Sequence, residues 1–316
     1  MKISVLALNY KSKINWISFY LERENYMAGT IAIGVQDFGE LISNNCFYID
    51  KTSFIKEWWD NMDSVTLITR PRRFGKTLTI SMLERFFSIQ YYNESAIFEH
   101  LDIWKYPEYR EIMGTYPVME RGLMTGITRV SKESIFSDLN NMEVVTTTSV
   151  KYADVYGFTE DEVFSALDEY GLSDIKDKVK RWYDGFLFGN SKDIYNPWSI
   201  INLLDKKQLG TYWANTSANG LIAKLIQEGD RNIKQLFETL LKGESIVCEI
   251  DEQIIYNQLS INDNAIWSLL LASGYLTVVN YIGYGDAKLP ENCMPQYELK
   301  ITNYETKLMF NELVKN

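Results

Sequence analysis

Eight consecutive residues combine the side chains and the backbone freedom needed to hold a phosphate group: Arg70, Pro71, Arg72, Arg73, Phe74, Gly75, Lys76 and Thr77. The N–H groups at a helix N-terminus carry partial positive charge and attract anions. In such a loop the lysine reaches the β- and γ-phosphates, while the threonine hydroxyl takes a position on Mg²⁺. A glycine lets the backbone approach the phosphates without a Cβ atom. Residues 70–77 are therefore a candidate site for the phosphates of a nucleotide, with Thr77 as the metal ligand.

The elements on either side of this loop are those that a phosphate-binding loop requires. Residues 65–69 form a short apolar run rich in β-branched types, which predicts a buried strand. After the loop, Leu78, Met82 and Phe86 recur at helical spacing and predict an amphipathic helix. The order strand, turn and helix is the layout of a P-loop, or Walker A motif.

A plainer interpretation of the same residues is a basic turn that only caps the helix. The usual P-loop pattern has glycine at its first position, where this chain has Arg70. Pro71 fixes its own φ angle and removes one N–H donor from the loop. Because the strand and helix are both in place, nucleotide binding is the favoured interpretation and the capping turn is the alternative.

Composition indicates an ordinary globular protein of about two domains. The chain has 316 residues, 46% of them hydrophobic, which is enough for a sizeable core. Its net charge of −10 argues against a broad nucleic-acid surface. The cysteines Cys46, Cys248 and Cys293 are far apart, which argues against a disulfide framework or a zinc site. With His100 as its single histidine, the chain cannot use a mechanism that needs several.

No segment reads as a targeting sequence or a membrane span. Residues 1–28 differ in character from the rest of the chain and are interpreted as an N-terminal extension. Residues 264–285 contain no charged residue and are long enough to span a bilayer. Ser273-Gly274 interrupts them, however, and several polar residues make the segment too polar to do so. The default expectation is a cytoplasmic protein.

Several motifs together give a specific family resemblance. They cover nearly everything from about Gly34 onward: Asp37-Phe38, Tyr48-Ile49-Asp50-Lys51-Thr52, the loop itself, residues 124–141, residues 156–163, Trp182-Tyr183-Asp184-Gly185-Phe186, residues 194–199, residues 212–217 and residues 273–276. This set resembles the bacterial AAA-ATPase-like family, whose members often carry a C-terminal PD-(D/E)XK nuclease-like domain. The resemblance implies ATP and Mg²⁺ as ligands, and in that family an arginine at the first loop position is usual. By local pattern, Asp50-Lys51-Thr52 caps a helix, and a second nucleotide contact is the less favoured alternative.

The chain departs from the family in one important place. Family members continue after a strand like residues 116–118 into a long segment that ends in the Walker B Asp-Glu pair. Here Val118 runs directly into Met119, so the ATPase domain is interpreted as internally deleted near 118–119. The acidic residues at 249–252 and 168–169 are not convincing replacements. Hydrolysis is therefore expected to be impaired, because a carboxylate near Mg²⁺ positions the metal and activates water.

The resemblance also places the strand that carries the sensor residue beside the loop-bearing strand, at about Leu123–Thr128, and a third strand of the sheet near Val144–Thr148. The sheet would then keep three neighbouring strands and expose one edge, which favours self-association or a protein partner. Arg129, at the end of the first of these strands, is the candidate catalytic residue, as a sensor of the γ-phosphate. The alternative for Arg129 is an arginine that stabilises the helix expected after Ser131.

The remainder of the chain is expected to be mainly helical and winged-helix-like. A helix at 265–272, strands at 275–282 and 296–301 and a final helix capped by Asn303 are the basis for that expectation. No nuclease signature is found here. The predicted fold is thus α/β: a truncated P-loop NTPase parallel sheet followed by the helical region. The predicted domains are a P-loop AAA-ATPase-like domain over 29–150 and the helical, winged-helix-like region over 151–316.

The sequence therefore favours an ATP-binding, AAA-ATPase-like protein whose hydrolysis is impaired. A non-catalytic interaction or regulatory module is the alternative. DNA binding through the hairpin module is less favoured, because the chain is acidic and the hairpin lacks a basic wing.

Overall fold

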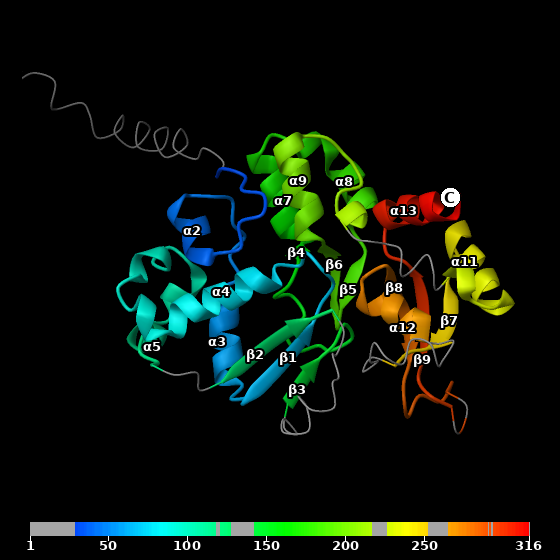
Figure 1. Ribbon diagram of the computed structural model, residues 1–316, viewed down its shortest axis with the longest axis horizontal. Helices are drawn as coiled ribbons and strands as arrows, with labels where there is room; N and C mark the ends of the chain where they lie inside the picture. The colour runs from blue at the N-terminus through cyan, green and yellow to red at the C-terminus, as the bar shows by residue number, and fades with distance from the viewer. Residues whose placement is uncertain are drawn as a thin grey trace, which may run out of the picture.

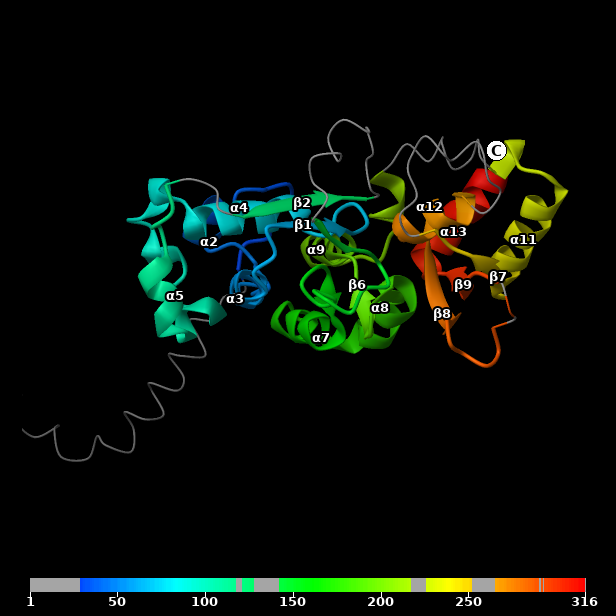
Figure 2. The ribbon, with the colours of Figure 1, turned by 90° about the horizontal axis from the view of Figure 1, so that it is seen from below.

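The computed structural model describes residues 29–117, 121–127, 142–216, 226–251, 265–289, 291 and 293–315. The expected N-terminal extension, residues 1–28, lies outside the described residues. The described chain forms three groups of elements arranged along the long axis of the molecule (Figure 1). The view from below shows the same order, with the helices α7, α8 and α9 in the middle (Figure 2).

The first group is built on a parallel sheet of three strands in the order β2-β1-β3. The strands are β1 (Val65–Thr69), β2 (Gly122–Gly126) and β3 (Met142–Val145). Ile68 in the centre of the sheet is opposite Thr125 on one side and Val145 on the other. The strand before the loop and its two parallel neighbours are therefore confirmed.

Helices and short 3-10 turns pack around this sheet. They are α2 (Phe38–Ser43), α3 (Ser53–Asp60), α4 (Lys76–Phe87), α5 (Pro107–Ile112), η1 (Ile89–Tyr91), η2 (Ser95–Ile97) and η3 (Asp102–Lys105). Helix α4 begins at Lys76, so the last two residues of the 70–77 loop form its first turn, and it buries Met82, Leu83 and Phe86. Leu78, expected on the same face, is only partly buried because it also lines a cavity in front of the loop.

The second group is a small antiparallel sheet with three helices. Its strands follow the order β4-β6-β5, and its elements are β4 (Phe158–Thr159), α7 (Glu160–Glu169), η4 (Ser173–Ile175), α8 (Lys176–Tyr183), β5 (Phe186–Phe188), β6 (Ser191–Tyr195) and α9 (Pro197–Lys206). Thr159 and Glu162 form a capping box at the start of α7. The side chain of Asn196 caps α9, with Pro197 at the first helical position.

The third group lies at the C-terminal end of the described chain. It contains η5 (Ala214–Thr216), α11 (Arg231–Lys242), β7 (Ile246–Glu249), α12 (Ala265–Ala272), β8 (Leu276–Ile282), β9 (Gln296–Ile301) and α13 (Tyr304–Lys315). The predicted hairpin is present as β8 and β9, and Asn303 accepts a hydrogen bond from the N–H of Thr306 at 3.0 Å. The sheet is antiparallel in the order β7-β9-β8.

The region after residue 150 therefore differs from its expectation in one respect. Besides its helices, the described part of this region carries six strands, of which β4, β5, β6 and β7 were not predicted. These strands have two to five residues each, which is too short for a clear alternating pattern. Within the described residues, no helix is both long enough and apolar enough to cross a bilayer.

The largest hydrophobic core crosses from the first group into the third. Ile68 of the parallel sheet and Phe74 of the loop belong to the same buried cluster as Phe186, Trp213 and Leu270. A second cluster lies between α7, α8 and α9. Because the first core is continuous, the loop after β1 packs against the C-terminal elements on its inner side.

Candidate functional site

The loop between β1 and α4 is anchored at its first residue by a buried arginine. The Arg70 guanidinium donates hydrogen bonds to the carbonyl oxygens of Thr69 at 2.8 Å, Thr146 at 2.7 Å and Tyr152 at 3.1 Å. It also lies over the ring of Phe188. Burial lowers the pKa of Arg70 to about 10. The side chain is fully buried and points away from the loop's open side, so only its backbone is available to a ligand there.

Pro71 and Phe74 hold the same loop by apolar contacts. Phe74 is buried between Phe186 and Phe188, with ring centroids 5.0 and 5.4 Å away. Pro71 is buried against Gly274, whose φ is +82° and where an added Cβ atom would lie 2.7 Å from the proline ring. The buried residues Arg70, Pro71 and Phe74 thus fix the shape of the loop from behind, and Arg73, Gly75 and Thr77 are exposed.

The outward side of the loop presents backbone donors. Arg73 and Gly75 both have positive φ, 65° and 80°, which turns the chain sharply before α4. The N-cap residue of α4 is Gly75, which has no side chain that could accept a hydrogen bond from the first N–H groups of the helix. Within the described residues, the N–H groups of 73–77 have no acceptor, and the hydroxyl of Thr77 has no hydrogen-bond partner. An unpaired row of N–H groups at a helix N-terminus suits an anion.

Lys76 is held over the loop without an anionic partner in the described chain. Its ammonium group donates to the carbonyl oxygens of Arg70 at 2.9 Å and Pro71 at 2.6 Å. Burial, with Arg70 nearby, lowers the pKa of Lys76 to about 8. The charged form of Lys76 therefore has no negative group beside it, and a phosphate group would supply that negative charge.

Arg72 connects the loop to the C-terminal elements. Its guanidinium donates to the hydroxyl of Tyr275 at 3.1 Å and lies 5.4 Å from the ring centre of Trp213. The indole N–H of Trp213 donates in return to the Arg72 carbonyl at 3.0 Å. Glu305, buried in α13, accepts the backbone N–H of Trp213 at 2.6 Å and the hydroxyl of Ser199 at 2.8 Å. Residues from several of the motifs that carry the family resemblance thus meet directly behind the loop.

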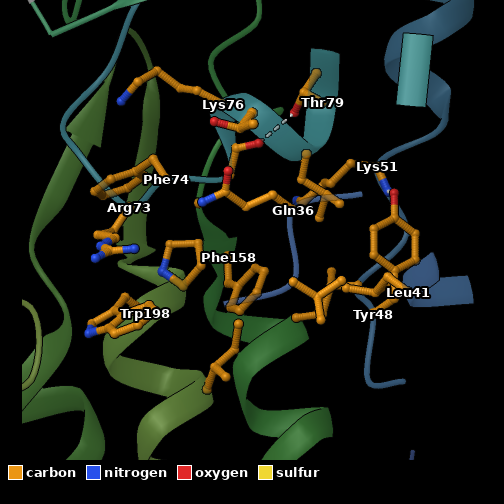
Figure 3. Close-up of a pocket in the computed structure, with 18 of the residues that line it drawn as sticks. Gln36, Leu41, Tyr48, Lys51, Arg73, Phe74, Lys76, Thr79, Phe158 and Trp198 are labelled. Carbon is orange, nitrogen blue, oxygen red and sulfur yellow. Dashed lines mark hydrogen bonds between the residues drawn. The ribbon is translucent and has the colours of Figure 1, made fainter. Parts of the chain in front are cut away.

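A cavity of about 440 Å³ opens in front of the loop (Figure 3). One end is lined by the loop residues Arg72 to Thr77 and by Gly126 and Ile127 at the end of β2. The other end is apolar and is lined by side chains from four segments: Ile31, Val35, Phe47, Ile49, Phe158, Pro197, Trp198 and Ile201. Its volume lies within the range of small-molecule sites. The cavity thus joins the cationic loop to a largely apolar wall, with Arg73 and Lys51 beside that wall, and this combination matches the character of a nucleotide.

The segment Asp50-Lys51-Thr52 has a structural role at the start of α3, although the side chain of Thr52, the N-cap residue, makes no capping hydrogen bond. Asp50 accepts from the N–H and hydroxyl of Thr52 at 2.8 and 2.7 Å, and from the N–H of Asp102 at 2.6 Å. Lys51 forms an ion pair with Glu162 at 2.7 Å, although it also lines the cavity. These contacts fasten the start of α3 to η3 and α7.

The candidate carboxylates for metal binding and water activation lie away from the cavity. Glu249 ends β7 in the third sheet, and Asp168 lies in α7, where it pairs with Lys176 at 2.7 Å. Neither lines the cavity, and among the described residues that line it there is no carboxylate. Arg129, the candidate catalytic residue, lies outside the described residues.

Three residues at this cavity were not predicted from the sequence. Gln36 and Phe158 lie in or beside motifs that carried the resemblance, but no local pattern gave them a role. The helical spacing of Trp198 favours core packing; the side chain does pack partly buried against the core, and it also lines the cavity, 4.2 Å from the guanidinium of Arg73. The signal that could have found them is their position close to glycine or proline, where a backbone turn brings side chains to a cavity.

Comparison with known proteins agrees with the resemblance. The family model described as predicted AAA-ATPase matches residues 32–179, so this segment, just under half of the chain, is similar to the AAA-ATPase-like family. A curated relative, described as an uncharacterized protein in the vnfD 5′ region of Azotobacter chroococcum mcd 1, is 26% identical over 194 residues. The match covers 60% of this chain and 33% of the relative, so the chain spans about a third of that protein's length. No solved structure matches.

Proposed function

We propose that this protein binds ATP with Mg²⁺ in the cavity in front of the 70–77 loop. The observation that carries the proposal is the composition of the cavity within the described residues. Its loop side carries N–H groups without an acceptor and cations without an anionic partner, and the rest of its wall is largely apolar. A nucleoside triphosphate needs both ends, whereas a turn that only caps a helix needs neither.

Each loop residue then has a defined part. The N–H groups of 73–77 and the ammonium of Lys76 hold the phosphates, and the guanidinium of Arg73 extends the cationic end. The Thr77 hydroxyl, which has no partner in the described chain, suits Mg²⁺, because this ion usually keeps several waters and takes few protein ligands beside phosphate oxygens. Arg70, Pro71 and Phe74 support the loop from behind, and Arg72 ties it to the third group of elements.

Hydrolysis is proposed to be impaired. Among the described residues that line the cavity, no carboxylate can position Mg²⁺ or polarise an attacking water. Arg129 remains the proposed γ-phosphate sensor. We further propose a bacterial, cytoplasmic setting, supported by the Azotobacter relative and by the lack of a membrane-spanning helix in the described residues.

Calorimetric titration with Mg-ATP tests the proposal on the wild type, Lys76→Ala and the control Lys105→Ala. Lys105 is an exposed lysine of η3, so its removal takes one positive charge from elsewhere. We expect binding in the wild type and the control, and its loss in Lys76→Ala. Phosphate release from the same samples should stay at background. Equal affinity in all three proteins would contradict the role of the loop, and clear turnover would contradict the impaired hydrolysis.

The metal position is tested by Thr77→Val, which keeps the side-chain shape and removes the hydroxyl. Affinity for ATP should become nearly independent of Mg²⁺ in Thr77→Val, while the control Thr239→Val, in the distant helix α11, should behave as the wild type. A full Mg²⁺ response in Thr77→Val would mean that another group holds the metal.

One observation favours a second function, as a protein-interaction or regulatory module. In the described chain β2 pairs only with β1, and beside it lies an apolar cavity of about 350 Å³ lined by Trp58, Trp59, Leu83, Phe87 and Leu123 among others. An unpaired strand edge beside apolar surface favours association. Sedimentation at several protein concentrations would detect a dimer, and a monomer throughout would remove self-association. Winged-helix-like DNA binding by the β8–β9 hairpin stays the less favoured proposal.

A further inference from the structure

The apolar end of the cavity has a composition that the phosphate-binding role does not explain. Phosphates need donors and cations, yet this end is made of side chains such as Val35, Phe158 and Ile201. Flat apolar surface that faces a cavity suits the face of a nucleobase, which stacks on aromatic rings. Since the two ends belong to one cavity, a ligand with phosphates on the loop would extend toward these residues.

Phe158 is the aromatic ring best placed to accept a base. It stands in β4 and follows Gly157, whose φ of +91° lets Phe74 of the loop approach to within 3.1 Å of where a Cβ atom would lie. This close approach puts Phe158 next to the loop (Figure 3). Of the other aromatic rings at that end, Trp198 already lies against the guanidinium of Arg73 at 4.2 Å, and Phe47 packs edge-to-face with Phe158, with ring centroids 6.4 Å apart.

Gln36 supplies the polar group that such a subsite would need. Its side chain is exposed and has no hydrogen-bond partner within the described residues. In Figure 3 its amide points into the cavity, between Phe158 on one side and the start of α4, marked by Lys76, on the other. It therefore lies where the polar edge of a stacked base would need a partner.

The chemistry of the amide favours one base over another. A glutamine side chain has one acceptor and one donor group, which match the N6 donor and N7 acceptor of adenine. Guanine presents two acceptors, N7 and O6, on the same edge, so a glutamine amide placed at this N7 edge can satisfy only one of them. The selection therefore applies to a base whose N7 edge faces Gln36. Among the described residues, the lining also lacks a carboxylate that could accept the N1 and N2 donors of guanine.

We propose that Phe158 and Gln36 form a base-recognition subsite that selects adenine over guanine. This inference rests on the proposed function, because it takes the phosphates to lie on the 70–77 loop. Phe158 supplies stacking surface for either purine, and Gln36 discriminates between them.

Three probes separate the subsite from the loop: Mg-ATP, Mg-GTP and inorganic tripolyphosphate with Mg²⁺, each titrated into the full chain. Stacking and a bidentate contact are each worth about tenfold or more in affinity. The wild type should therefore bind ATP at least about tenfold more tightly than GTP, and GTP more tightly than tripolyphosphate. Gln36→Ala should bind ATP and GTP alike, with tripolyphosphate affinity unchanged. Phe158→Leu should weaken both nucleotides and spare tripolyphosphate.

Matched controls come from the same chain. Gln235→Ala removes an exposed glutamine from α11, and Phe164→Leu truncates a partly buried phenylalanine in α7. Both should keep the wild-type preference. Should Phe158→Leu fail to fold, the exposed Gln36 variant still decides the question. Equal binding of ATP and tripolyphosphate by the wild type would remove the subsite and leave the loop standing, and a preference for GTP would overturn the role of Gln36. Absence of binding for all three probes would instead refute the proposed function.

Discussion

Replacing Arg70 by methionine should weaken the fold and leave nucleotide binding in place. The guanidinium donates three hydrogen bonds to backbone carbonyls, and at about 1.5 kcal/mol for each charged bond they contribute about 4–5 kcal/mol. Burial opposes this: lowering the pKa of Arg70 to about 10 corresponds to a cost of about 3 kcal/mol. Methionine fills similar space without that cost, so the free energy of unfolding of Arg70→Met should be about 1–2 kcal/mol lower than that of the wild type.

The assay compares urea unfolding with Mg-ATP affinity, the latter measured where each variant is fully folded. Arg70→Ala should lose about 2 kcal/mol more than Arg70→Met, because it leaves a cavity. Arg231→Met, on an exposed arginine of α11, is the control and should change neither quantity. Lys76→Ala should show the opposite pattern, with affinity lost and stability unchanged or slightly higher. If Arg70→Met were as stable as the wild type but could not bind ATP, the guanidinium would have to contact the ligand, and our assignment would be refuted.

Three further substitutions probe the surroundings of the loop. Gly274→Ala should cost about 2–4 kcal/mol in a denaturant titration, because the new Cβ meets Pro71 at a positive φ. Glu305→Ala should lower the melting temperature, because buried donors lose their acceptor and the free energy of unfolding falls by about 3 kcal/mol. Glu305→Gln should retain part of this stability. Burial, with Asp193 nearby, raises the pKa of Asp184 to about 7, so the folded state holds a proton that the unfolded chain releases near pH 4. Stability from this group therefore falls as pH rises from about 4 to 7. Asp184→Asn should match the wild type at pH 4 and exceed it by about 1 kcal/mol at pH 7.5, a modest value because the carboxyl is partly exposed. An equal difference in stability between Asp184→Asn and the wild type at both pH values would contradict this prediction.

The elements that carry the loop could be predicted because their signals are local. The apolar run at 65–69 and the 3.6-residue period of α4 each act within a few positions of the chain. The two parallel neighbours of β1 needed the family resemblance, because nothing in one strand states which other strand it pairs with.

The position of Arg70 could not be predicted for the opposite reason. Two of its three acceptors are carbonyls 76 and 82 residues further along the chain, so an arginine in a basic loop looked like part of a charged surface. Phe158, Trp198 and Gln36 were missed because three distant segments bring them to one cavity. Strand β7 was missed because four residues with one charge among them gave no clear alternation until β9 paired with them.

Hydrogen exchange of the backbone amides of 73–77, with and without Mg-ATP, would test nucleotide binding at the atoms proposed to do it. These N–H groups have no acceptor within the described residues, so they should exchange quickly in the free protein. We predict that Mg-ATP slows their exchange in the wild type and has no effect in Lys76→Ala. Unchanged exchange at 73–77 at an ATP concentration that saturates binding would show that the nucleotide lies elsewhere, and would contradict the proposed site.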